Sequence, residues 1–137
     1  MAFVPIDGDS GKYKEVAAAD AITFVKGNAV VDDGNGLLTN ASAGGNVDIF
    51  WVVMESKLTT ASGEKVLCVR TDGVTFLADC DAAWSQTDVL TQVDLASAAT
   101  LNPDAVTDQL FYIERGVGIA GTGKQVIGHF VPGAPNA

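Results

Sequence analysis

The sequence contains few groups suited to metal or thiol chemistry. Its 137 residues include two cysteines, Cys68 and Cys80, and a single histidine, His129. The cysteines are twelve residues apart and form no C-x-x-C pair, so a zinc site lacks ligands. We expect both thiols to be small buried hydrophobic groups, with a disulfide as the alternative if they lie on neighbouring strands. We predict no metal and no cofactor.

Positive charge is also scarce. Eight Lys and Arg residues stand against 17 Asp and Glu, which gives a net charge of −9, and the basic residues are scattered along the chain. Such a surface repels phosphate backbones and anionic lipid headgroups. We therefore expect no nucleic-acid partner and no membrane partner.

Long hydrophobic runs are missing as well. The longest, residues 49–54, is six residues and too short to cross a bilayer. The start of the chain has neither a basic segment nor a long apolar segment, so we expect no secretory signal and a protein that stays in the cytoplasm or assembles there.

The residues that are abundant favour strands. Hydrophobic residues make up 47% of the chain, charged residues only 18%, and there are 15 glycines. We predict a mostly β fold, a small β-barrel or sandwich with at most one or two short helical turns. Pro5, Gly8 and Gly11 interrupt the pattern near the start, which predicts an extended N-terminal arm over 1–19 and a single β-rich domain over 20–137.

Short β-rich runs separated by turn residues give the expected strands. They cover residues 22–25, 29–31, 37–39, 47–55, 65–70, 74–78, 89–95, 109–114 and 125–131. Asp72-Gly73 between two of these runs predicts a β-hairpin. The run 47–55 is apolar on both faces, which indicates a central strand covered on each side or a strand in an interface. One helical turn is expected within 81–88.

The glycine-rich segment before the last strand imitates two nucleotide-binding motifs. Gly116, Gly118 and Gly121 spell G-x-G-x-x-G, and Gly118 to Lys124 spell G-x-x-x-x-G-K. A phosphate loop needs Ser or Thr after the lysine and a following helix. Here Gln125 follows the lysine and a β-rich run begins, so we interpret the segment as a hairpin loop.

No convergent catalytic set is visible in the sequence. His129 is the only imidazole, and no strand-nucleophile-helix elbow surrounds a serine or cysteine. Most carboxylates lie in turn contexts, where they accept hydrogen bonds from the backbone. A loop calcium site at Asp32, Asp33 and Asn35 is the alternative, although the EF-hand spacing is missing. We predict no catalytic residues and that the chain is not an enzyme.

The two tryptophans are candidates for core or contact positions, because large aromatic side chains contribute strongly to both. We place Trp51 in the core. Trp84 lies in a polar segment and suits either the core or a subunit contact.

Several segments together resemble the capsid decoration, or cement, proteins of tailed-bacteriophage heads. They are the extended start 1–6, the run 93–95, the run 108–113 and the closing run 126–131, set in a Gly- and Ala-rich acidic chain. The resemblance implies a β-rich structural virion protein on the capsid outer surface that stabilises the capsid by bridging neighbouring subunits. It implies the major capsid protein as partner and a homotrimer as the expected assembly.

On this resemblance, the N-terminal arm supplies the contact with the capsid. Phe3, Val4, Pro5 and Ile6 could add a strand to an exposed sheet edge, and we list Trp84 with them as a capsid or subunit contact. On this interpretation, deleting residues 2–8 leaves the domain folded and weakens lattice binding.

Two other functions remain open. A phage tail-tube or head-completion protein would extend hairpins between subunits, and residues 47–55 could form one arm. A small ligand-binding β-barrel would instead line its cavity with that same segment.

Overall fold

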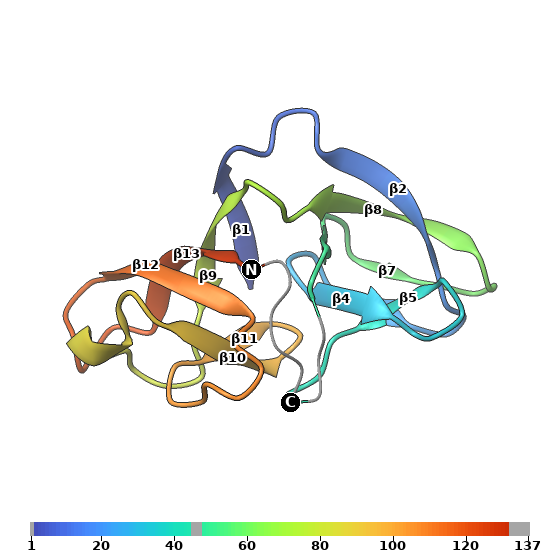
Figure 1. The fold of residues 1–137 in the computed structure, drawn as a ribbon. Helices are drawn as coiled ribbons and strands as arrows, with labels where there is room; N and C mark the ends of the chain where they lie inside the picture. Colours follow the sequence, from blue (N-terminus) through green and yellow to red (C-terminus); the bar gives the residue numbers. More distant parts are fainter. Residues whose placement is uncertain (1, 45–47, 132–137) are drawn as a thin grey trace.

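The computed structural model describes residues 2–44 and 48–131. Two β bodies lie side by side, a closed five-stranded barrel and a six-stranded sheet (Figure 1). The barrel order is β2-β5-β4-β6-β8, the sheet order is β1-β9-β13-β12-β10-β11, and β3 pairs with β7 alone. The prediction of a mostly β fold with a small barrel is confirmed.

The strands take the following bounds in chain order. They are β1 (Phe3–Asp7), β2 (Tyr13–Ala18), β3 (Thr23–Phe24), β4 (Ala29–Asp32), β5 (Leu38–Asn40), β6 (Trp51–Val53), β7 (Lys57–Leu58), β8 (Glu64–Arg70), β9 (Thr75–Asp79), β10 (Gln92–Ser97), β11 (Thr100–Asn102), β12 (Phe111–Val117) and β13 (Gln125–Phe130). A 3-10 turn, η1 (Gln86–Asp88), lies within the segment where one helical turn was expected. In the described part of the chain, no helix is long and apolar enough to cross a membrane.

The alternation of side chains along the barrel strands produces two hydrophobic clusters. On β8, Val66 and Cys68 point into the barrel, whereas Val69 belongs to a second cluster that continues into the six-stranded sheet. Successive side chains of a strand point to opposite faces, so one strand can serve both clusters. The second cluster therefore joins the barrel and the sheet into one body.

Strand β6 shows the same division. Val53 lies in the barrel interior and Val52 lies in the shared cluster, and β6 pairs with both β4 and β8. The expectation of a central strand covered on both sides is confirmed. The strand is only three residues long, however, so the long hairpin arm that a tail-tube protein would need from 47–55 does not form in the described residues.

Aromatic rings fill the centre of the six-stranded sheet. The Phe130 ring lies 5.0 Å from Phe3, 5.4 Å from Phe76 and 5.1 Å from Phe111, measured between ring centroids. All four side chains are buried. Phe3 comes from the start of the chain and Phe130 from its end, so the two ends of the described chain are packed together.

The prediction that residues 1–19 form an arm separate from the β-rich domain is wrong. Residues 3–7 are extended, but as β1 they pair with β9 in the sheet, and residues 13–18 form β2 of the barrel. The Phe3 side chain is fully buried. Deleting residues 2–8 would remove a core phenylalanine, which typically costs about 3–5 kcal/mol. The expectation that this deletion leaves the domain folded is therefore withdrawn.

The hairpin predicted at Asp72-Gly73 is also wrong, although the turn exists. The Val74 N–H donates to the Thr71 carbonyl at 3.2 Å, but β8 pairs with β2 and β6 whereas β9 pairs with β1 and β13. The buried Thr71 fixes the crossing, because its hydroxyl donates to the Ile49 carbonyl at 2.6 Å. The turn carries the chain from the barrel into the sheet.

Candidate functional site

An apolar groove lies where the outer edge of β1 meets the barrel. Its volume is about 340 Å³, and six residues line it: Val4, Pro5, Tyr13, Lys26, Met54 and Leu67. The junction is fixed by backbone bonds, since the Phe3 N–H donates to the Gly27 carbonyl at 3.1 Å and the Gly27 N–H donates to the Val53 carbonyl at 2.7 Å. Lys26 carries the only formal charge among the lining residues.

The edge strand beside the groove is poorly suited to accept another strand. Pro5 has no N–H to donate, and the register shifts between Pro5 and Asp7. Proline and bulges are features that keep edge strands from pairing. Ile6, at the shift, is 47% exposed. This edge therefore offers apolar side chains to a partner and few backbone donors, which argues against strand addition as the mode of contact.

Polar contacts hold the loop between β1 and β2 that borders the groove. The Tyr13 hydroxyl donates to the Asp9 carboxylate, and this bond raises the pKa of Tyr13. Lys12 donates to the Asp72 carbonyl and lies 3.6 Å from the Asp72 carboxylate. The loop is thus tied to the turn between β8 and β9, and Tyr13 is positioned at the groove.

The predicted contact residues fall into three groups. Val4 and Pro5 line the groove, and Ile6 follows them on the exposed part of β1. Phe3 is buried and cannot touch a partner, so this assignment is corrected. Trp84 is also buried, with 5% of its surface exposed, and its assignment as a capsid or subunit contact is corrected in the same way.

Trp84 anchors the glycine-rich hairpin between β12 and β13. Its indole N–H donates to the Val117 carbonyl at 3.0 Å, its backbone N–H donates to the Gly123 carbonyl at 3.0 Å, and its carbonyl accepts from the Gly121 N–H at 2.8 Å. A Cβ at Gly116 would lie 2.1 Å from the indole ring. The interpretation of this segment as a hairpin loop is confirmed, and the indole explains why glycine is needed at position 116.

The residues weighed for catalysis are spread over the surface and the core. His129 Nδ1 lies 3.5 Å from the Glu114 carboxylate, and its ring lies beside Tyr112 with centroids 5.2 Å apart. Cys68 and Cys80 are free, buried and in different clusters, and burial raises the pKa of each to about 12. The expectation of buried thiols is confirmed, and the disulfide alternative is wrong.

The acidic loop between β4 and β5 is organised by its own carboxylates. Asp32 Oδ1 accepts from the N–H groups of Gly34 and Gly36 at 2.8 and 2.9 Å, and Asp33 Oδ1 accepts from the Asn35 N–H at 2.8 Å. The expectation that these carboxylates bond to the turn backbone is confirmed. Across residues 2–44 and 48–131, no group of three or more His, Cys, Asp or Glu side chains could hold a metal ion.

Sequence reasoning missed a buried carboxylate, Asp94 on β10. Its two oxygens accept from three successive backbone N–H groups, those of Thr107, Asp108 and Gln109, at 2.7–3.0 Å. The alternating pattern around residue 94 predicted a strand but gave no sign that one carboxylate would organise a loop thirteen residues later. This arrangement is structural, because all three donors are backbone groups of the same loop.

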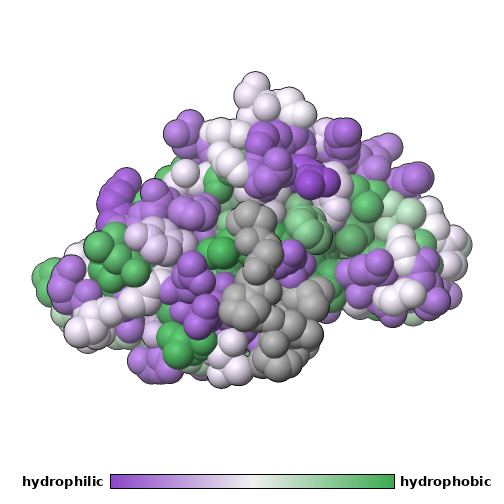
Figure 2. Space-filling model, viewed as in Figure 1, coloured by the Kyte–Doolittle hydropathy of each residue, from purple (hydrophilic) through white to green (hydrophobic). Residues whose placement is uncertain are grey.

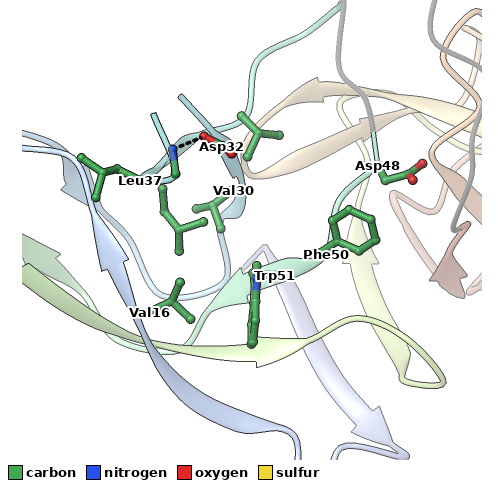
Figure 3. Close-up of a pocket in the computed structure, with 10 residues that line it drawn as sticks. Val16, Val30, Asp32, Leu37, Asp48, Phe50 and Trp51 are labelled. Atoms are coloured by element: carbon green, nitrogen blue, oxygen red, sulfur yellow. Dashed lines mark hydrogen bonds between the residues drawn. The ribbon is translucent and has the colours of Figure 1, made fainter. Parts of the chain in front are cut away.

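A second apolar hollow opens at the barrel, and sequence reasoning did not predict its polar rim. The cleft has a volume of about 280 Å³ and is lined by β2, β4, β5 and the segment that enters β6 (Figure 3). Val16, Val30 and Trp51 face it, and Asp32 and Asp48 are its only charged residues. Strands β2 and β5 pair only at Ala18 and Leu38, so the barrel wall is weakest beside this cleft.

The face of the molecule drawn in Figure 2 is mixed. Hydrophilic residues, apolar residues and residues of intermediate hydropathy are interspersed on it, and apolar areas appear in its middle as well as toward its ends (Figure 2). Exposed large apolar side chains include Ile6, Val25, Leu58 and Ile119. Single apolar residues are common on protein surfaces and carry no functional meaning by themselves; Ile6 is of interest because it directly follows Pro5, which lines the groove.

No protein-family model matches the chain, and no curated protein or solved structure matches it either.

Proposed function

We propose that this chain is a structural virion protein that binds the outer surface of an assembled tailed-phage capsid and stabilises it by bridging neighbouring capsid subunits. The observation that carries the proposal is the apolar groove beside β1, where Val4 and Pro5 meet Tyr13 and other residues of the barrel, and where the next residue of β1, Ile6, is exposed. The major capsid protein is the proposed partner, and the virion is the proposed location.

The joined core supports a bridging role. A protein that holds two capsid subunits together must not bend between its contacts. Here the shared cluster contains Val52 and Val69 of the barrel together with Phe76 and Phe111 of the sheet. Interiors packed in this way transmit strain rather than absorb it. Contacts made by the two bodies would therefore be held at a fixed distance.

The groove suits a contact made by side chains. Its volume is close to the lower end of the range for ligand pockets, about 300 Å³, so it has room for one or two apolar side chains of a capsid loop. Lys26 at the rim could pair with a carboxylate on that loop. Such a small contact would be weak alone, and a homotrimer bound at several lattice points would add the effective concentration that makes it durable.

Two matched substitutions test the role of this surface. Ile6→Asp places a charge one residue after Pro5, which lines the groove, and Ile119→Asp places the same charge on the hairpin between β12 and β13, where Ile119 is 76% exposed. We expect Ile6→Asp to weaken binding to empty phage heads by at least about tenfold and Ile119→Asp to leave it near the wild-type value. The assay is co-sedimentation with heads across a concentration series.

The outcomes are distinct. Equal binding by both variants and the wild type would contradict the role of the groove, and no binding by the wild-type chain would contradict the capsid role itself. Light scattering of the chain alone adds a second criterion. A discrete trimer agrees with decoration, whereas open-ended growth into rings or tubes would favour the tail-tube alternative.

A further inference from the structure

The cleft in the barrel wall combines an apolar lining with negative charge. Val16, Val30 and Leu38 lie along it, and the aromatic residues Phe50 and Trp51 close one side. Of the ten residues that line it, only Asp32 and Asp48 are charged, and both are acidic (Figure 3). An apolar pocket with a few polar groups at its rim is the usual form of a small-molecule site.

We propose that this cleft binds a small organic cation, an ammonium group attached to an apolar body about the size of one aromatic ring. The volume of about 280 Å³ admits a ligand of that size. Apolar side chains would surround the body, and the Asp32 carboxylate at the rim would pair with the ammonium. This site is separate from the groove beside β1, so the proposal does not depend on the capsid role and either can fail alone.

The geometry of Asp32 supports this assignment. Both of its hydrogen bonds to the loop backbone, from Gly34 and Gly36, use Oδ1, which leaves Oδ2 available to a ligand. The residue is exposed at the rim rather than buried among apolar groups. A carboxylate held in place by its own turn loses little freedom when a cation binds, which favours pairing.

The aromatic wall already accommodates a cation. The Arg70 guanidinium lies 5.7 Å from the Phe50 ring centroid and 5.3 Å from the Trp51 ring centroid, within the range of a cation–π contact. Its charge is balanced by Asp72, whose Oδ1 accepts from Arg70 Nε at 2.9 Å. Across residues 2–44 and 48–131, Asp32 takes part in no salt bridge, so no nearby basic side chain balances its charge at the cleft.

Three probes that share one apolar body test the charge preference. They are 2-phenylethylammonium, 2-phenylethanol and 3-phenylpropanoate, which carry a positive, neutral and negative head. Binding is followed by two-dimensional NMR, in which the indole N–H of Trp51 reports on the cleft and that of Trp84 serves as an internal control. We expect the cation to bind most tightly and to shift the Trp51 signal but not that of Trp84.

The chain offers a matched pair of variants. Asp32→Asn removes the charge and keeps the oxygen that bonds to Gly34 and Gly36. Asp33→Asn makes the same change one residue away, in a carboxylate that bonds to the same loop but does not line the cleft. We expect Asp32→Asn to weaken binding of the cation about two- to fivefold, as for a solvent-exposed ion pair, and Asp33→Asn to leave it unchanged.

A variant on the opposite wall provides a second test. Val16→Phe fills the cleft from β2 and should abolish binding of the cation while leaving Asp32 in place. The proposal is overturned if the alcohol or the carboxylate binds as tightly as the ammonium, or if the Trp51 signal does not move. It is also overturned if Asp32→Asn and Asp33→Asn weaken binding equally, because the cation would then be responding only to the net charge of −9.

Discussion

Replacing Gly116 with alanine tests how Trp84 holds the hairpin between β12 and β13. A Cβ at position 116 would lie 2.1, 2.2 and 2.4 Å from three indole carbons, whereas ordinary contact begins near 3.4 Å. The indole would have to move by about 1 Å, and a well-packed core resists such a shift. The movement would also stretch the bond from the indole N–H to the Val117 carbonyl, now 3.0 Å long.

The expected loss of stability is the sum of the overpacking cost and the cost of the lost hydrogen bond. Overpacking a core costs about 1–3 kcal/mol, and a lost neutral hydrogen bond about 1 kcal/mol. We therefore expect Gly116→Ala to lower the free energy of unfolding by about 2–4 kcal/mol, a large part of the total for a domain of this size. The midpoint of thermal unfolding should fall by roughly 10 °C.

Urea unfolding followed by tryptophan fluorescence measures the change. The control is Gly44→Ala, because a Cβ at Gly44 meets nothing within 4 Å. The free energy of unfolding of Gly44→Ala should stay within about 0.5 kcal/mol of the wild-type value. In a Trp84→Leu background the cost of Gly116→Ala should shrink, since the smaller side chain leaves room for the methyl group. Equal stability of Gly116→Ala and Gly44→Ala would refute the reasoning.

Three further results are expected. Burial raises the pKa of Cys68 and Cys80 to about 12. Neither thiol should therefore react with a thiol reagent at mildly alkaline pH until the protein is unfolded in urea. Rapid labelling of the folded protein would contradict this. Asp94→Ala should lower the free energy of unfolding by about 3 kcal/mol, as measured in urea, because it leaves three backbone donors without their acceptor, one of them buried and two partly buried, and Asp94→Asn should cost less. The hydrogen bond from Arg70 lowers the pKa of Asp72 from 3.8, so this pair adds stability above that pH and loses it as the pH falls through the lowered value. Arg70→Gln should therefore destabilise more near neutral pH than in strong acid, where only the contacts of Arg70 with Phe50 and Trp51 are lost; an equal loss at both pH values would contradict the assignment.

Local sequence patterns predicted the strands well because strand formation depends on alternation and on turn residues. The runs that became β4, β8, β9, β12 and β13 could all be recognised in this way. The glycine-rich hairpin was recognised too, since β-branched residues follow Lys124 where a phosphate loop would begin a helix. These features depend on neighbours in the chain.

Pairing between strands could not be predicted in the same way. Asp72-Gly73 has the composition of a hairpin turn, but the bond from the Thr71 hydroxyl to the Ile49 carbonyl directs the chain into the second sheet. That partner is 22 residues away in sequence. Phe3 likewise looked like part of a free arm, because its neighbours Phe111 and Phe130 lie at the other end of the chain.

The candidate site was only partly predictable for the same reason. Val4 and Pro5 were named from the apolar start of the chain, and they do line the groove. Met54 and Leu67 were not named, because only the junction of the sheet edge with the barrel brings them beside β1. For Trp84 the sequence allowed either the core or a subunit contact, and it is a core residue; only its assignment as a contact was wrong, because its polar neighbours gave no sign of the glycine-lined space that receives the indole.

The central claim is that this chain bridges capsid subunits on the outside of a phage head. A cryo-electron microscopy comparison of heads with and without the purified chain tests it most directly. The account predicts added density on the outer surface at the junctions between capsid subunits, with the groove beside β1 facing the lattice. Heads that carry no added density, or density found only on the tail, would contradict it.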